Sequence, residues 1–146
     1  MKQTRLFPVI GVMALLVLAG CAQTGSTSQQ TPTPANPASA SMSATVNITS
    51  NGYDPQSVTV KKGGTVTWVN TADSPNWPAS AVHPTHEKYP GSSIAKCNTP
   101  EASTTFDACK ELASGESYSF VFNEAGEWPY HNHVDAATFG KVIVVG

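Results

Sequence analysis

Charge is scarce in this sequence, and positive charge most of all. Charged residues make up 12% of the 146 residues, and the single arginine, Arg5, lies in the N-terminal segment. After residue 20 the chain has six lysines against ten carboxylates, a net charge of −4 with neutral histidines. Proteins that bind nucleic acid present clustered lysine and arginine side chains to the phosphates. The composition therefore excludes a nucleic-acid-binding function.

Long apolar runs are equally scarce. The one such run, Leu6 to Leu18, follows Lys2 and Arg5 and leads into Leu18-Ala19-Gly20-Cys21. A short apolar run behind a positive start is typical of a secretory signal peptide, not of a membrane-spanning helix. The small residues before Cys21 resemble the lipobox of bacterial lipoproteins, in which cleavage leaves the cysteine as a lipidated N-terminus. We expect residues 1–20 to be a lipoprotein signal peptide; an ordinary signal peptide is the alternative.

Lipidation of Cys21 would anchor the protein at the cell envelope, since each buried acyl methylene contributes about 0.8 kcal/mol. By resemblance to Gram-negative lipoproteins, Ala22 after the cysteine favours the outer membrane, at its periplasmic face. Residues 21–43 carry no charge and nothing large and apolar before Met42. Such a segment cannot bury enough surface to offset its ordering entropy. We expect a disordered tether over 21–43 and a single domain over 44–146.

Helical periodicity is missing from residues 44–146. Apolar and β-branched residues instead alternate in short runs bounded by glycine-rich turns, and Lys61-Lys62-Gly63-Gly64 is typical of such a turn. The runs are Ala44–Ser50, Ser57–Val60, Thr65–Asn70, Glu116–Phe122, Trp128–His133 and Lys141–Val145. Six or seven short strands predict an all-β, antiparallel sandwich.

Histidine is rare, and all four histidines fall in two pairs. His131 and His133 lie two positions apart in an expected strand, so both side chains project from one face. His83 and His86 lie in His-Pro-Thr-His, a polar segment suited to a loop. We expect the fold to join the two pairs around one metal ion.

Several motifs resemble the cupredoxin fold: Tyr53-x-Pro55, the run from Val58 to Asn70, Gly126-x-x-x-Tyr130 and Gly140-Lys141-Val142-x-Val144. The resemblance covers residues 44–146 except for a stretch near 91–105 that looks inserted. Secreted bacterial cupredoxin-like domains with His-Pro-Thr-His, Gly-Glu-Ser-Tyr-Ser-Phe and Tyr-His-x-His are more similar still. The resemblance implies a Greek-key β-sandwich of two sheets, with copper bound among loops at one end.

The chain departs from blue-copper proteins in its lack of sulfur ligands. Those proteins bind copper through two histidines, a thiolate and usually an axial methionine. By the family's spacing, the thiolate position falls on Tyr130, the methionine position on Thr138 and a histidine position on His133. The upstream histidine is missing near Asn76. Met42, the only methionine after residue 20, lies in the expected tether.

Cys97 and Cys109 are the only cysteines after Cys21. In a secreted chain, two cysteines close in sequence are expected to form a disulfide, which would contribute about 3 kcal/mol. The alternative is that one of them reaches the histidines as a thiolate and restores a blue site.

An all-histidine site remains, with His83, His86, His131 and His133 as ligands. Imidazole suits copper and zinc, and Cu(II) binds more tightly than Zn(II). The His131-x-His133 strand is also similar to a copper-binding strand of multicopper oxidases. Glu87 and Asp135 neighbour the pairs and are candidates to coordinate the ion or to orient an imidazole, but we favour ordinary solvated carboxylates. We expect Trp77, Trp128 and Tyr130 to pack around the site.

Two functions follow from such a site. The first is a lipid-anchored copper protein that binds, buffers or hands on copper to a partner protein. The second is redox: an electron carrier with a redox partner, or a small copper oxidoreductase. We favour binding, because the thiolate and the axial methionine that tune the potential of blue sites are missing.

Overall fold

The computed structural model describes residues 40–146; residues 1–39, which include the expected signal peptide, Cys21 and most of the tether, lie outside them. The strands are β1 (Ser41–Thr49), β2 (Gly52–Asp54), β3 (Ser57–Asn70), β4 (Pro78–Ser80), β5 (Ser117–Phe122), β6 (Gly126–Asn132) and β7 (Asp135–Val145). Two 3-10 turns, η2 (Ile94–Lys96) and η3 (Ala102–Thr104), complete the described part. No helix among residues 40–146 is long and apolar enough to cross a membrane. β1 begins three residues before the strand expected from the sequence.

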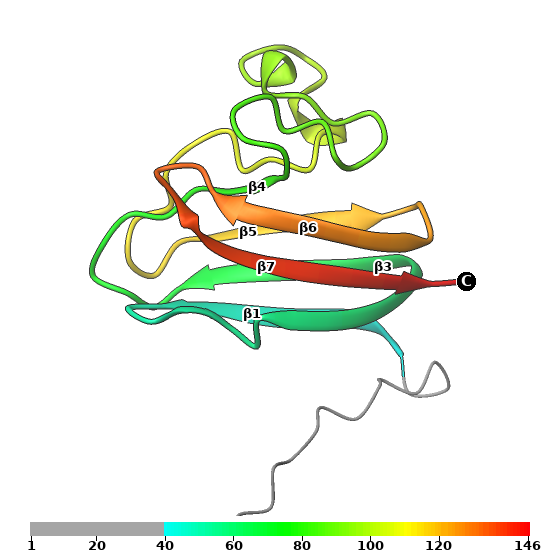
Figure 1. The fold of residues 1–146 in the computed structure, drawn as a ribbon, viewed down its shortest axis with the longest axis horizontal. Helices are drawn as coiled ribbons and strands as arrows, with labels where there is room; N and C mark the ends of the chain where they lie inside the picture. The colour runs from blue at the N-terminus through cyan, green and yellow to red at the C-terminus, as the bar shows by residue number, and fades with distance from the viewer. Residues whose placement is uncertain (1–39) are drawn as a thin grey trace, which may run out of the picture. The chain divides into compact units, whose positions relative to one another are not determined.

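β3 belongs to both layers of the sandwich. Its first part, 57–61, pairs with β7, and its second part, 64–69, pairs with β5. Between them the ribbon curves back on itself (Figure 1). Gly63 has a φ of 81°, and a Cβ on Gly64 would lie 2.7 Å from the carbonyl oxygen of Lys61. The predicted turn is therefore where the chain reverses, although the strand continues through it.

The ladders are not all antiparallel. β1 and β7 each run parallel to the part of β3 that they pair with, whereas the β1–β2, β3–β5, β4–β6 and β6–β7 ladders are antiparallel. The strand order is β2-β1-β3-β7-β6-β4, with β5 beside β3. The all-β sandwich is confirmed, but the antiparallel expectation is wrong for two ladders. Alternation reveals which face of a strand is buried, not which strand lies beside it.

The core lies between the two layers and is rich in aromatic rings. Trp68 is fully buried, and its ring lies 5.2 Å from those of Phe106 and Tyr130. The other inward residues are Val46, Ile48, Tyr53, Val58, Val60, Val66, Tyr89, Leu112, Phe120, Phe122, Val142 and Val144. Tyr130, at the position where the family resemblance places a thiolate, thus belongs to the core and not to the metal site.

A long excursion, residues 81–116, joins β4 to β5 and rises beyond the end of β4 (Figure 1). Phe106 fixes it to the core with a fully buried ring. Two backbone hydrogen bonds fix it to β4: Ser80 N–H donates to Phe106 O at 2.8 Å, and Ala108 N–H to Pro78 O at 2.9 Å. The stretch expected to be inserted, 91–105, thus leads back into Phe106 and Asp107, which lie against the sandwich.

Candidate metal centre

His131 and His133 stand at the end of β6, where the chain turns into β7. His131 pairs with Phe139, and the register shifts before Asn132. The Asn132 Oδ1 atom accepts from Trp77 N–H at 3.0 Å and Val134 N–H at 3.2 Å, which fixes the turn. The two imidazole centroids lie 6.4 Å apart, on the same side of the chain, as the spacing predicts.

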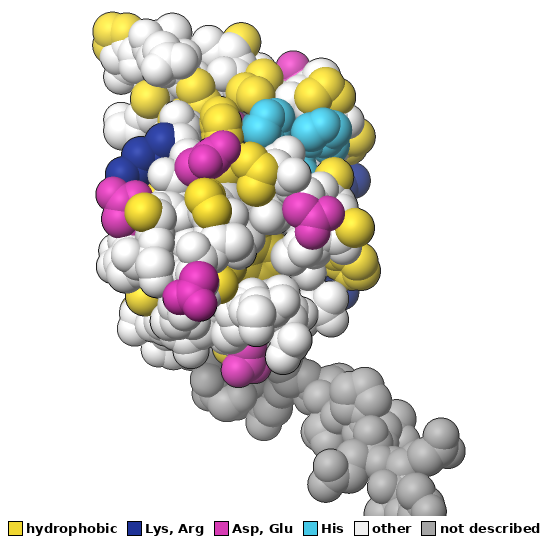
Figure 2. Space-filling view, turned by 90° about the vertical axis from the view of Figure 1, so that its left-hand side faces the viewer, with side chains coloured by type: hydrophobic (Ala, Val, Ile, Leu, Met, Phe, Trp, Pro, Cys, Tyr) yellow, Lys and Arg dark blue, Asp and Glu magenta, His cyan; other side chains and the backbone are white. Residues whose placement is uncertain are grey.

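The loop after β4 carries the other pair. His86 is fully buried and has a φ of 61°, a left-handed conformation that few residues other than glycine adopt. Its N–H donates to Val82 O at 2.7 Å, which fixes that conformation. His83, in contrast, is exposed. Figure 2 shows histidine side chains grouped on one face, among hydrophobic and acidic side chains.

The structure brings all four histidines together. His83 Nδ1 lies 3.2 Å from His131 Nε2, and His86 Nε2 lies 2.9 Å from His133 Nδ1. One nitrogen from each ring lies within 4.8 Å of the other three. Metal–imidazole bonds of about 2.0–2.1 Å place neighbouring nitrogens about 3 Å apart and opposite ones about 4 Å apart. The donor set therefore fits a single ion that prefers nitrogen ligands.

Burial is the main influence on the pKa values of the two histidines at the end of β6. The pKa of His131 is lowered to about 4, chiefly by burial and then by the nearby His86, His83 and His133, while Asp107 acts in the opposite direction. Burial, followed by the charges of His86 and His83, also lowers the pKa of His133. At neutral pH the imidazole of His131 is therefore unprotonated, as a metal ligand must be.

Asp107 is the residue at this site that the sequence did not indicate. Its carboxylate is buried, and Oδ2 lies 2.5 Å from His86 Nδ1. Glu87 and Asp135, the carboxylates expected near the histidines, are exposed, and Asp135 accepts instead from Ala137 N–H and Thr138 Oγ1. Asp107 lies 21 residues after His86, and no spacing rule links the two.

Sulfur does not reach the site from the described residues. Cys97 and Cys109 form the expected disulfide, so the thiolate alternative is wrong. Met42 lies in β1, not in a tether, and is 55% exposed. It adjoins Gly63 at the bend of β3, where Lys61 pairs with the last residues of β7. The histidines lie beside the first residues of β7, at the opposite end of that strand.

Only one of the three aromatic residues expected around the site is there. The ring of Trp77 lies 4.5 Å from that of His133. Trp128 packs on Tyr89 at 5.1 Å, and Tyr130 lies in the core. Sequence position alone therefore did not separate aromatic residues of the core from those of the site.

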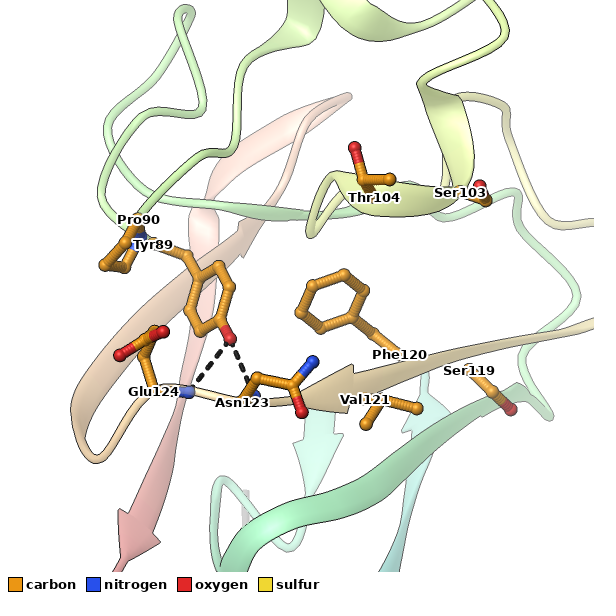
Figure 3. Close-up of a pocket in the computed structure, with 9 residues that line it drawn as sticks. All are labelled: Tyr89, Pro90, Ser103, Thr104, Ser119, Phe120, Val121, Asn123 and Glu124. Atoms are coloured by element: carbon orange, nitrogen blue, oxygen red, sulfur yellow. Dashed lines mark hydrogen bonds between the residues drawn. The ribbon is translucent and has the colours of Figure 1, made fainter.

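A separate groove of about 390 Å³ lies between β5 and η3 (Figure 3). Tyr89 lines it, and the Tyr89 hydroxyl accepts from Asn123 N–H at 2.9 Å and Glu124 N–H at 3.2 Å. Phe120 and Val121 line it, but no histidine or cysteine does. The groove offers no nitrogen or sulfur ligand, so the histidine cluster is the candidate metal centre.

The sequence matches a family of copper-binding proteins and two plastocyanins. The model of the family "Copper binding proteins, plastocyanin/azurin family" matches residues 40–145. Plastocyanin of Scenedesmus fuscus is 36% identical over 94 residues, which cover 63% of this chain and 85% of that protein. A chloroplastic plastocyanin of Tetradesmus obliquus is 32% identical over 98 residues, covering 63% of this chain but only 57% of the plastocyanin.

Solved structures support the same fold. A purple cupredoxin from Nitrosopumilus maritimus superposes with a TM-score of 0.53 at 22% identity, covering 69% of this chain and 98% of that one. A reduced amicyanin variant gives 0.51 at 22% identity, covering 72% and 84%. These likenesses show the fold alone, whereas the family model also matches the sequence over nearly all the described residues. The chain belongs to the plastocyanin/azurin family of copper-binding proteins.

Proposed function

We propose that this protein is an envelope-anchored copper-binding protein that holds copper through imidazole nitrogens and buffers it or hands it on. The observation that carries the proposal is the convergence of His83, His86, His131 and His133, with one nitrogen from each within 4.8 Å of the others. Family membership favours copper over zinc, and the imidazole donors agree, because Cu(II) binds more tightly than Zn(II) to such sites.

The chemistry of the donors makes this a non-blue site. Blue-copper sites need a cysteine thiolate, and Cys97 and Cys109 are joined in a disulfide. Four neutral nitrogens favour Cu(II), which prefers a tetragonal nitrogen environment. Binding and release of copper need no further chemistry from the chain.

The unequal burial of the ligands supports transfer. His86 and His131 are buried, whereas His83 is exposed on the loop after β4. An exposed ligand is the one that a partner protein can replace first without unfolding the site. A copper-transfer partner that approaches from the His83 side is therefore part of the proposal.

Anchoring through Cys21 also belongs to the proposal. It is supported by the sequence of residues 1–21, which resembles a lipoprotein signal. The proposed location is the periplasmic face of the envelope, with the outer membrane favoured by Ala22. Metabolic labelling with palmitate tests it: label on the wild type and none on Cys21→Ser is expected, and equal label on both would contradict it.

The test of the copper site is a Cu(II) titration of the purified mature protein, followed by visible absorption and electron paramagnetic resonance. We expect a pale complex with nitrogen hyperfine structure. His131→Ala and His133→Ala should each weaken binding by about tenfold or more, since even the loss of a ligand's hydrogen-bonding partner costs that much. Thr85→Ala, an exposed residue of the same loop, serves as the control and should bind normally. An intense visible band, or unchanged binding in both histidine variants, would refute the site.

Electron transfer, or a small copper oxidoreductase, is the second candidate. The observation that favours it is the exposure of His83, which brings one imidazole of the site to the surface where a redox partner can contact it. Voltammetry of the copper-loaded protein separates the two candidates. A reversible, fast couple supports the electron carrier, whereas slow reduction with loss of copper supports binding and transfer.

A further inference from the structure

The carboxylate of Asp107 is buried at 2% exposure, and both of its oxygens have hydrogen-bonding partners. Its Oδ1 atom accepts from Trp77 Nε1 at 2.6 Å and from Cys109 N–H at 2.7 Å. Its Oδ2 atom faces His86 Nδ1 at 2.5 Å. The backbone is fixed as well, because Asp107 N–H donates to the Tyr118 hydroxyl at 2.9 Å.

The two partners of Oδ1 decide which group can occupy that position. An indole N–H and a backbone N–H can donate but cannot accept. Only an acceptor oxygen therefore fits at Oδ1, whatever side chain stands at position 107. The other arm of that side chain must then face His86.

The second nitrogen of His86 faces the metal centre. Nε2 lies 2.9 Å from His133 Nδ1, whereas Nδ1 is already in contact with Asp107, so Nε2 is the nitrogen available to a metal shared with the other histidines. In a neutral imidazole one nitrogen carries the proton and the other the lone pair. A metal ion bound at Nε2 needs the lone pair there, so the proton must be on Nδ1.

We propose that Asp107 is a positioning residue that keeps the proton of His86 on Nδ1 and so leaves Nε2 free to bind copper. The identity of the ion rests on the function proposed above; the position of the proton does not. No other carboxylate among the described residues bonds to a histidine, so we expect a carboxylate to fix the position of the ring proton only in His86.

Asp107→Asn is the informative substitution because asparagine has nearly the same shape. Its amide oxygen must take the Oδ1 position, where Trp77 and Cys109 donate. Its NH2 group then points at His86 Nδ1 and can only donate. His86 has to accept at Nδ1 and carry its proton on Nε2, where the metal would bind. The substitution should therefore reverse the tautomer with the fold intact.

The experiment is nitrogen-15 NMR of the histidine side chains in the metal-free mature protein at mildly alkaline pH, where the nitrogen shifts distinguish protonated from unprotonated ring nitrogens. The wild type should show the His86 proton on Nδ1, and Asp107→Asn should show it on Nε2. The Cu(II) affinity of the variant should fall about 10- to 100-fold. Asp135→Asn removes the same charge close to His133 without a histidine contact, and should change neither tautomer nor affinity.

A wild-type protein with the His86 proton on Nε2 would overturn the inference. Because this measurement needs only the wild type, it tests the inference even if Asp107→Asn fails to fold. An unchanged tautomer in a folded Asp107→Asn would also overturn it, as would a reversed tautomer with unchanged Cu(II) affinity. A protein that shows the tautomer reversal but does not bind copper would support the role of Asp107 toward His86 and refute the proposed copper function.

Discussion

At the scale of single residues, His131 shows how burial prepares a ligand. Its pKa is lowered to about 4 from an ordinary value of 6.5. Between these values the unfolded chain binds a proton that the folded metal-free protein does not, so acidification destabilises the fold. Burial of the neutral His131 imidazole therefore costs no stability above pH 6.5. The free energy of unfolding decreases as the pH falls from 6.5 toward 4.

NMR titration of the metal-free protein should therefore find His131 half-protonated near pH 4. Proton competition with the metal at this ligand should begin well below the pH expected for an unburied imidazole. His133 should shift in the same direction. A His131 midpoint close to 6.5 would show that the site is open to water and would contradict the buried arrangement.

Gly140 provides a second test at this scale. It lies opposite Tyr130 in the β6–β7 ladder, and a Cβ there would collide with the tyrosine ring and lie 2.8 Å from the carbonyl oxygen of Gln56. Gly140→Ala should lower the free energy of unfolding by about 1–3 kcal/mol, the usual effect of overpacking. Gly146→Ala is the control, because nothing lies within 4 Å of its Cβ position. Equal urea midpoints for the two variants would show that Tyr130 can move away.

At the scale of elements, the sequence was most informative where one face is buried. Phe120 and Phe122 alternate with exposed residues in β5, and Val66 and Trp68 alternate with half-buried residues in β3, as expected. The partners of these strands could not be predicted, because a parallel ladder such as β3–β7 joins residues about 84 positions apart (Ser57 with Lys141) and leaves no local pattern.

The disulfide of the β4–β5 excursion gives a prediction about that element. Cys97 and Cys109 close a loop of sequence separation 12 that ends next to Asp107. Replacing both with serine should lower the free energy of unfolding by about 3 kcal/mol, mainly because the unfolded chain regains entropy. Urea unfolding measures the loss. A reducing agent should produce the same loss in the wild type and none in the variant; a wild type that is insensitive to reduction would contradict the prediction.

At the scale of the whole molecule, the site is assembled from distant parts of the chain. His83 and His131 are 48 residues apart, His86 and His133 are 47 apart, and Asp107 follows His86 by 21 residues within the same excursion. The histidines could be predicted because the residue type is rare and suited to metals. Asp107 could not, because ten carboxylates follow residue 20 and only the packing of the excursion against β4 singles out one of them.

A metal ion at this site would join the excursion to the end of β6, and this gives a prediction for the stability of the whole domain. A ligand that binds only the folded state stabilises it by about 2.7 kcal/mol at a concentration 100 times its Kd. For a domain of this size, that raises the Tm by roughly 10–20 °C. Differential scanning calorimetry with and without Cu(II) measures the shift, and a chelator should reverse it. At the same Cu(II) concentration the shift should be clearly smaller in His131→Ala, because that variant binds copper more weakly; a shift of equal size in both proteins would mean that copper stabilises the fold from somewhere other than the histidine cluster.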